Sequence, residues 1–413
     1  MKKEQFIGRK TYLWGTGVEG QAVISWWNKN LANETLGIIE ENIIPDDAEI
    51  IIKSPGVSFY LPQIKEAKNR GVIFTSVLNI FFANLSYKPI VIGITGTKGK
   101  STSVSMLSFM LEKLGKKVGL AGNIGTPPLD FLEQKVDYLV FELSSFQIMS
   151  LDYPVDYAMV VNISQAHTDW HLTYENYRMD KLSILKYPQT VKILNYEDKW
   201  LREFKGNNII YYDKDNGFHV DGGSIYDKKE KLDLPPLQIF GAHNLSNICG
   251  VLTIIKSLGL DYKKALSALK DFAPLEHRLQ KVYEKNGLKF INDSIATVAD
   301  SVIAGVNSFD EDIALIVGGF DNGPDYTELD KFIENTLRIK VALCLPDTGR
   351  MLKNSKCVQV NNMKEAVFEA VKRLKKGIVL LSPAAPSFNM YKNYKERGYD
   401  FTNLAKELSD EVI

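Results

Sequence analysis

The chain has 413 residues, more than one ordinary hydrophobic core holds, which predicts about two to four domains. Its hydrophobic fraction of 45% and charged fraction of 24% are typical of a soluble globular protein. Fifty basic residues balance fifty acidic ones, so the overall charge gives no indication of nucleic-acid or anionic-membrane binding.

Three features of the sequence indicate the compartment. The three cysteines, Cys249, Cys344 and Cys357, are scattered and form no CxxC pair, as in proteins of a reducing compartment. The first residues lack the apolar run of a signal peptide. No stretch of about 18 uncharged apolar residues predicts a membrane span. We therefore expect a cytoplasmic protein.

Short apolar runs alternate with helical patterns along most of the chain, which predicts an α/β fold with mostly parallel sheets. Three domains are expected, over residues 1–87, 88–273 and 274–413. The first boundary falls at Lys88-Pro89, because proline begins a new segment and cannot extend a helix.

The first block contains a glycine-rich turn between two predicted strands. Residues 11–14 read as a strand, Gly15-Thr16-Gly17 opens the turn, a helix follows, and residues 35–40 read as a second strand. This order is typical of a nucleotide-binding half-unit. A plain tight turn explains the same glycine pattern about as well.

The second block opens with a buried strand, residues 90–95, which leads into Gly96-Thr97-Lys98-Gly99-Lys100-Ser101-Thr102 and a helical pattern. Glycines let backbone N–H groups approach phosphate oxygens, and the helix N-terminus adds positive potential. Lys100 can reach the β- and γ-phosphates, and the Ser101 hydroxyl can bind Mg²⁺. The usual motif has glycine where this chain has Ile94, so the loop is a variant. It predicts ATP binding.

The third block contains four predicted strands, at residues 289–293, 313–319, 341–345 and 378–382. Polar residues follow several of these strand ends. Because ligands of open α/β sheets bind at the carboxyl ends of the strands, this edge is a candidate binding site.

Over essentially its whole length the chain resembles the Mur ligase superfamily. The motifs that carry the resemblance occur in the family's order, at residues 96–102, 142–147, 162–169, 241–247, 277–278 with 292–294, and 381–398. The last of these is similar to the branch that adds D-glutamate.

The resemblance implies a Rossmann-like N-terminal domain, a central P-loop-type ATPase domain and a Rossmann-like C-terminal domain. It also implies a reaction of peptidoglycan precursor synthesis, in which ATP phosphorylates the carboxylate of UDP-N-acetylmuramoyl-L-alanine. The amine of D-glutamate then attacks the acyl phosphate, and ADP and phosphate are released. Two Mg²⁺ ions and a monomeric chain are expected from the same likeness.

The likeness assigns the catalytic roles to Lys100, Glu142, His167 and Lys181. The metal ligands would be Ser101, Glu142, His167 and Lys181, the last as a carbamate formed with CO₂. Each side chain also has an ordinary structural explanation. A strand-end acid can cap a helix, a lone histidine is often structural, and a helix lysine is often solvated.

The likeness divides the remaining candidate residues among three ligands. The ATP contacts would be Gly96, Thr97, Lys98, Gly99, Lys100, Ser101, Thr102, Asn123, Asn244, Asn247, Arg278 and Asp293. The contacts to the UDP-substrate would be Gly15, Thr16, Gly17, Ser54, Pro55, Gly56, Asn123 and Ser144. The amino-acid contacts would be Thr297, Asn322, Ser387, Phe388 and Tyr394. Asn123 lies next to a glycine, and an asparagine at such a position is also common in ordinary turns.

Two positions depart from the D-glutamate branch, because Ile295 and Asn322 stand where it usually has lysines. Losing a charge-assisted contact to a carboxylate costs on the order of 1.5–3 kcal/mol. Lys392 can supply a positive charge in compensation. The departures keep two alternatives open, a ligase of this type that adds another amino acid and a catalytically silent nucleotide-binding subunit. The tail motif disfavours a third, a folylpolyglutamate-type ligase.

Overall fold

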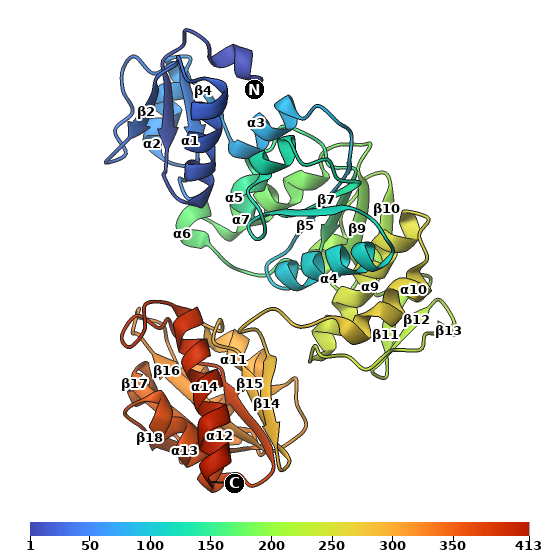
Figure 1. Ribbon diagram of the computed structural model, residues 1–413, viewed down its shortest axis with the longest axis vertical. Coiled ribbons are helices and arrows are strands. Elements are labelled where there is room, and N and C mark those ends of the chain that lie inside the picture. The colour runs from blue at the N-terminus through green and yellow to red at the C-terminus, as the bar shows by residue number, and fades with distance from the viewer. Residues whose placement is uncertain (413) are drawn as a thin grey trace. The chain divides into compact units, whose positions relative to one another are not determined.

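The computed structural model describes residues 1–412, and the chain divides into two compact units (Figure 1). Unit 1 comprises Met1–Pro235 and Leu245–Leu269, and unit 2 comprises Pro236–Asn244 and the chain from Lys270 onward. None of the helices described in either unit is long and apolar enough to cross a membrane. The domain boundaries expected at residues 87 and 273 stay a prediction.

The first sheet of unit 1 is parallel and has the strand order β2-β1-β3-β4. Its strands and helices are β1 Thr11–Trp14, α1 Val18–Asn30, β2 Leu36–Ile39, β3 Ile50–Lys53, α2 Pro62–Asn69, β4 Ile73–Thr75 and α3 Val77–Asn84. Alternate strand residues pack against α1 and α3 on one face and against α2 on the other. The helices that follow β1 and β3 cover opposite faces of the sheet. A crevice is therefore expected between the carboxyl ends of these two neighbouring strands.

The second sheet of unit 1 is also parallel, with the order β10-β9-β8-β5-β7-β6. Its strands are β5 Ile90–Thr95, β6 Val118–Gly122, β7 Tyr138–Glu142, β8 Tyr157–Val160, β9 Val191–Asn195 and β10 Ile209–Tyr212. The helices around it are α4 Lys100–Lys113, α5 Ser145–Ile148, α6 Thr168–His171, α7 Tyr174–Leu182, α8 Lys199–Arg202, α9 Ala242–Ser257 and α10 Tyr262–Ala268. Strands β8, β5 and β7 are adjacent, so the segments that follow them meet at one edge.

A small antiparallel sheet completes unit 1. It consists of β11 Phe218–Asp221, β12 Ser224–Asp227 and β13 Glu230–Lys231.

Unit 2 is built on one six-stranded sheet of order β14-β15-β19-β16-β17-β18, in which only the edge strand β14 runs antiparallel among the described strands. Its elements are β14 Gln280–Lys285, β15 Leu288–Asn292, α11 Ala299–Val306, β16 Ile313–Gly319, α12 Thr327–Asn335, β17 Ile339–Asp347, β18 Cys357–Gln359, α13 Met363–Arg373, β19 Gly377–Leu381 and α14 Tyr394–Val412. Helices α13 and α14 lie side by side on one face, and α11 and α12 cover the other (Figure 1).

The predicted fold class, α/β with mostly parallel sheets, is confirmed. The sequence prediction identified four strands of unit 2 and missed β14 and β18. Strand β14 is half-exposed and antiparallel, so it lacks the continuous apolar run of the strands that were found. Asn286-Gly287, which joins it to β15 with φ angles of +49° and +85°, is the turn signal that identifies this hairpin.

Candidate active site

The predicted phosphate loop lies between β5 and α4. Gly99 has a φ of +82°, in the left-handed region that favours glycine, and a Cβ there would lie 2.9 Å from Asn247 Oδ1. The Lys100 ammonium donates to the carbonyl oxygens of Gly96 at 2.9 Å and Thr97 at 3.1 Å, so it lies over its own loop. Glycines, backbone N–H groups and one ammonium thus gather at the N-terminus of a 14-residue helix, an arrangement suited to phosphate.

The segment after β8 holds this loop in place. Asn162 Oδ1 accepts a hydrogen bond from the Lys98 backbone N–H at 2.9 Å, and Asn162 Nδ2 donates to the Lys98 carbonyl at 3.1 Å. Ser101 and Thr102 lie in the first turn of α4, where Ser101 is half-buried and Thr102 is buried. The loop is therefore braced before any ligand binds.

Glu142 ends β7, the strand beside β5, and its side chain is buried. Its Oε1 accepts a hydrogen bond from Asn123 Nδ2 at 3.0 Å, and its carbonyl accepts one from the Asn123 backbone N–H at 2.9 Å. Its Oε2 is buried and finds no hydrogen-bond partner among the described residues. A buried carboxylate oxygen in this state is costly unless a ligand satisfies it, which makes Glu142 a binding candidate rather than a helix cap.

Lys181 lies in the last turn of α7, and only 2% of it is exposed, so it is not a solvated helix lysine. Its Nζ donates to the Gly96 carbonyl at 3.0 Å and to Thr95 Oγ1 at 3.3 Å. Burial lowers the pKa of Lys181 well below its usual range, the Lys100 charge lowers it further, and Glu142 opposes this. A lysine in such surroundings is neutral more often than usual and is a better nucleophile.

His167 begins α6 with a φ of +52°, a conformation that is uncommon for a residue other than glycine. Its ring centroid lies 5.1 Å from that of Phe146 and 6.0 Å from that of Tyr177. Burial lowers the pKa of His167, and the charges of Lys181 and Lys100 lower it further. The imidazole is therefore neutral near pH 7 and close to the lysine pair, a form suited to metal binding.

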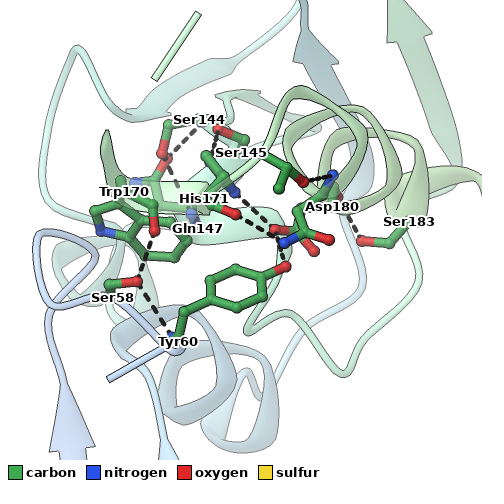
Figure 2. A network of polar contacts seen from close by, with 11 residues as sticks. Ser58, Tyr60, Ser144, Ser145, Gln147, Trp170, His171, Asp180 and Ser183 are labelled. Carbon is green, nitrogen blue, oxygen red and sulfur yellow. Dashed lines mark hydrogen bonds and ion pairs between the residues drawn. The ribbon is translucent and has the colours of Figure 1, made fainter. Parts of the chain in front are cut away.

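A polar network joins the first block of the chain to the helix that carries Lys181 (Figure 2). His171 is fully buried, with Nδ1 at 2.7 Å from Asp180 Oδ2 and Nε2 at 3.0 Å from Ser145 Oγ. The hydroxyl of Tyr60, just before α2, donates to the same Asp180 oxygen at 3.0 Å. Burial and then this hydrogen bond raise the pKa of Tyr60 to about 12. Asp180 therefore links the loop after β3 to the turn of α7 that contains Lys181.

The two turns predicted to hold the UDP-substrate meet at the ends of β1 and β3. Ser54 Oγ donates to the Gly15 carbonyl at 2.7 Å, and a Cβ at Gly15 would lie 2.8 Å from Ser54 Cβ. Gly15 has a φ of +96°, so neither the backbone nor the available space suits another residue. Thr16, Gly17 and Gly56 are exposed and Pro55 is half-buried. The structure therefore brings these candidates together at the neighbouring ends of β1 and β3.

The candidates Ser144, Asn244 and Asn247 lie at the starts of helices. Ser144 caps α5, where its hydroxyl accepts a hydrogen bond from the Gln147 backbone N–H at 3.2 Å. Asn244 and Asn247 are buried in the first turns of α9, and Asn244 Nδ2 donates to the Phe240 carbonyl at 2.6 Å. Their roles toward a nucleotide stay predictions.

In unit 2, Asp293 follows β15 and is buried. It accepts hydrogen bonds from the Leu279 backbone N–H at 3.2 Å and from Ser382 Oγ at 2.9 Å. Burial raises the pKa of Asp293 to about 7, although these two hydrogen bonds and the Arg278 charge oppose the rise. The charges of Asp293 and Arg278 therefore interact within this unit, and their assignment to ATP stays a prediction.

The amino-acid candidates of unit 2 follow the adjacent strands β15, β19 and β16. Arg397 is almost fully buried, and its guanidinium donates to the Ser294 hydroxyl at 3.0 Å and to the carbonyls of Ser294, Ala385 and Pro386 at 2.8, 3.0 and 3.2 Å. The loops after β15 and β19 are thus bound to α14. Among the candidates, Thr297, Asn322 and Phe388 are exposed, Tyr394 is half-buried and Ser387 is buried.

The sequence prediction did not single out Lys53, Tyr60 or Asp180. Lys53 has a visible signal, because a lysine ends an otherwise apolar strand directly before Ser54. Tyr60 and Asp180 lie 120 positions apart, and the sequence carries no signal of their contact.

The comparisons with known proteins agree with this geometry. Residues 94–255 match a family model described as the Mur ligase middle domain. The UDP-N-acetylmuramoylalanine--D-glutamate ligase of Pseudothermotoga lettingae is 36% identical over 382 residues, which cover 89% of this chain and 86% of that protein. The ligase of the same name from Fervidobacterium nodosum is 32% identical over 408 residues, which cover 94% of each chain.

A solved structure supports the fold. The MurF ligase from Thermotoga maritima in complex with ADP has a TM-score of 0.67 with this chain at 17% identity, over 98% of this chain and 95% of that one. The fold and the phosphate loop together define an ATP-dependent ligase of the Mur type. The chain belongs, within the Mur ligases, to the family of the UDP-N-acetylmuramoylalanine--D-glutamate ligases.

Proposed function

We propose that this chain joins D-glutamate to UDP-N-acetylmuramoyl-L-alanine in an ATP-dependent reaction that proceeds through an acyl phosphate. The observation that carries the proposal is the convergence of Lys100, Glu142 and Lys181 on the ends of β5 and β7, beside the phosphate loop. Its relatives are named UDP-N-acetylmuramoylalanine--D-glutamate ligases, which supports the choice of substrates.

The reaction requires two bond exchanges. A carboxylate oxygen of the UDP-substrate attacks the γ-phosphorus of ATP and ADP leaves. The amine of D-glutamate then attacks the acyl carbon, loses a proton, and phosphate leaves. Lys100 and the N–H groups of the loop hold the phosphates and offset their charge. Holding both acceptor substrates in one geometry accounts for much of the remaining acceleration.

Mg²⁺ fits the donors that surround this loop. Glu142 Oε2 is a buried carboxyl oxygen that accepts no hydrogen bond from the described residues, and hard cations prefer oxygen ligands. Ser101, His167 and a carbamylated Lys181 would complete the protein ligands of two ions. In residues 1–412 no group of three or more His, Cys, Asp and Glu side chains is placed to hold a metal. Phosphate and water would therefore supply the remaining ligands, as is usual for Mg²⁺. Bound there, the ions would neutralise charge on the transferred phosphoryl group.

Lys181 is proposed to carry the carbamate. Carbamylation needs a neutral amine, and the burial that lowers the pKa of Lys181 favours that form. The product is an anion beside Lys100, so the charge repulsion between the two lysines becomes attraction. Without the carbamate, Lys181 Nζ donates to the Gly96 carbonyl and the Thr95 hydroxyl and lies over the Tyr177 ring, 5.0 Å from its centroid.

The amino-acid end of the site is proposed to lie at the strand ends of unit 2 that Arg397 joins. Asn322 and Ile295 give no positive charge there, so hydroxyl, amide and backbone donors, with Lys392 in addition, would bind the carboxylates of D-glutamate. We expect weaker D-glutamate binding than in a site with lysine at these positions. We also expect a monomer that works in the cytoplasm.

The test is a ligation assay with purified chain, ATP, Mg²⁺ and UDP-N-acetylmuramoyl-L-alanine. D-glutamate should stimulate phosphate release and give a product heavier by one glutamyl residue. Turnover with another amino acid but none with D-glutamate would refute the choice of substrate. ATP binding with no phosphate release for any amino acid would favour the catalytically silent alternative.

A further inference from the structure

A buried lysine closes the loop that follows β3. Lys53 is the last residue of that strand, and only 1% of it is exposed. Its Nζ donates to the carbonyls of Ser54 at 3.1 Å and Val57 at 2.7 Å, which are the two ends of the loop at residues 54–57. The Phe59 ring lies against the same ammonium, 4.3 Å from Nζ to the ring centroid. The Lys53 side chain therefore joins the two ends of the loop.

The charged groups that face Lys53 come from two helices. Glu19 of α1 attracts its charge, and Lys68 of α2 repels it. The Glu19 carboxylate in turn accepts a hydrogen bond from Gln147 Nε2 at 2.6 Å, in the helix that Ser144 caps. Lys53 is thus the centre of a buried polar cluster that joins the β1 turn, the loop after β3 and α5.

Trp170 holds the same loop from the side of α6. Its indole N–H donates to the Gly56 carbonyl at 3.2 Å, and its own carbonyl accepts a hydrogen bond from the Ser58 hydroxyl at 2.8 Å, as Figure 2 shows for Ser58. Its ring centroid lies 5.7 Å from Lys53 Nζ. The loop is therefore held both by the Lys53 side chain and by the Trp170 indole.

We infer that Lys53 is a positioning residue for the UDP-substrate, which it serves by holding the loop at residues 54–57 against the Gly15 turn. The inference rests on the proposed function, since that loop and turn are the proposed site for the nucleotide end of the substrate. Lys53 itself need not contact the ligand, because its donors are directed to the loop.

The mechanism is one of pre-organisation. Methionine at position 53 keeps the unbranched shape of the side chain but donates no hydrogen bond. The Val57 carbonyl then loses its donor, the Ser54 carbonyl retains the Val57 backbone N–H at 3.2 Å, and Glu19 loses the charge that faces it. The loop then samples other conformations, and binding must select the competent one, which raises the apparent dissociation constant in proportion. The acyl phosphate chemistry at β5 and β7 is unchanged.

The experiment compares Lys53→Met with Lys192→Met in the full chain. Lys192 is a matched control, since it is also buried and donates to three backbone carbonyls, those of Tyr187, Thr190 and Asn207. Lys53→Met should raise the KM for UDP-N-acetylmuramoyl-L-alanine at least tenfold, with kcat and the KM for ATP within about threefold of the wild type. Lys192→Met should lower Tm and leave all three constants within twofold.

A gentler variant covers the case in which Lys53→Met does not fold. Trp170→Phe keeps an aromatic ring but removes the N–H that holds Gly56, and it should raise the same KM at least threefold. Calorimetric titration with UDP alone should show the same losses of affinity. A KM that stays within twofold of the wild type in every folded variant would overturn the inference. A wild-type chain that neither binds UDP nor turns over would instead overturn the proposed function, and the inference with it.

Discussion

Replacing Lys53 with methionine should change how the stability of the chain depends on pH. Burial lowers the pKa of Lys53 from 10.5 to about 7, with Glu19 opposing and Lys68 assisting the shift. Between these two pKa values the unfolded chain binds the proton and the folded chain does not. Unfolding then takes up a proton, so the free energy of unfolding rises with pH. Well below the lower pKa value, Lys53 is protonated in both the folded and the unfolded chain. Its contribution to the free energy of unfolding then no longer depends on pH.

The size of the effect follows from the two pKa values. Each pH unit in which only the unfolded state is protonated adds about 1.4 kcal/mol. Because Lys53 is half-protonated near pH 7, the gain between pH 7 and pH 9 comes to about 2 kcal/mol. The difference in free energy of unfolding, wild type minus Lys53→Met, should increase by that amount over this interval. Other titrating groups are common to both proteins and cancel.

Urea denaturation at pH 7, 8 and 9 measures this difference. The Lys65→Met variant removes an exposed lysine of α2 and controls for the loss of one positive charge, so it should follow the wild type. A difference between wild type and Lys53→Met that stays constant from pH 7 to pH 9 would refute the reasoning. It would mean that Lys53 remains protonated in the folded chain at pH 9.

Three further predictions concern the proposed site. Lys181→Ala should abolish turnover, and added acetate should restore part of it, because a small carboxylate can occupy the place of the carbamate; turnover at the wild-type rate would contradict this. Tyr60→Phe removes a hydrogen bond to a partly buried carboxylate, that of Asp180, and should lower the free energy of unfolding in urea by about 1–3 kcal/mol, whereas an unchanged midpoint would contradict it. Asn322→Lys adds a cation near the proposed carboxylate site and should lower the KM for D-glutamate roughly tenfold, with the KM for ATP as internal control; an unchanged or higher KM would place Asn322 outside that site.

Local patterns were enough to predict much of the fold. The glycine turn after β1 and the phosphate loop after β5 each lie between a strand and a helix, as their sequences predict. The reason is physical. Left-handed glycines, apolar strands and periodic helices each carry their signal within a few residues. Strand β18 has only three residues, 357–359, and none is fully buried, so it carries no comparable signal.

The polar partners of the site were beyond such patterns. The contacts of Asp180 with Tyr60 and of Gln147 with Glu19 depend on how the first block packs against the central sheet. Tertiary packing creates these contacts, and single-sequence periodicity does not encode it. The unpartnered oxygen of Glu142 is likewise visible only once its surroundings are known. The sequence motif identified Glu142 as a candidate ligand-binding residue. Its burial in the structure gives a physical reason for that prediction.

The most direct test of the proposed reaction is positional isotope transfer. UDP-N-acetylmuramoyl-L-alanine labelled with ¹⁸O in its alanyl carboxylate is incubated with the chain, ATP, Mg²⁺ and D-glutamate, and the released phosphate is analysed by mass spectrometry. An acyl phosphate intermediate predicts one ¹⁸O in each phosphate, formed in step with the D-glutamyl product. Unlabelled phosphate, or labelled phosphate without the product, would contradict the proposed ligase reaction.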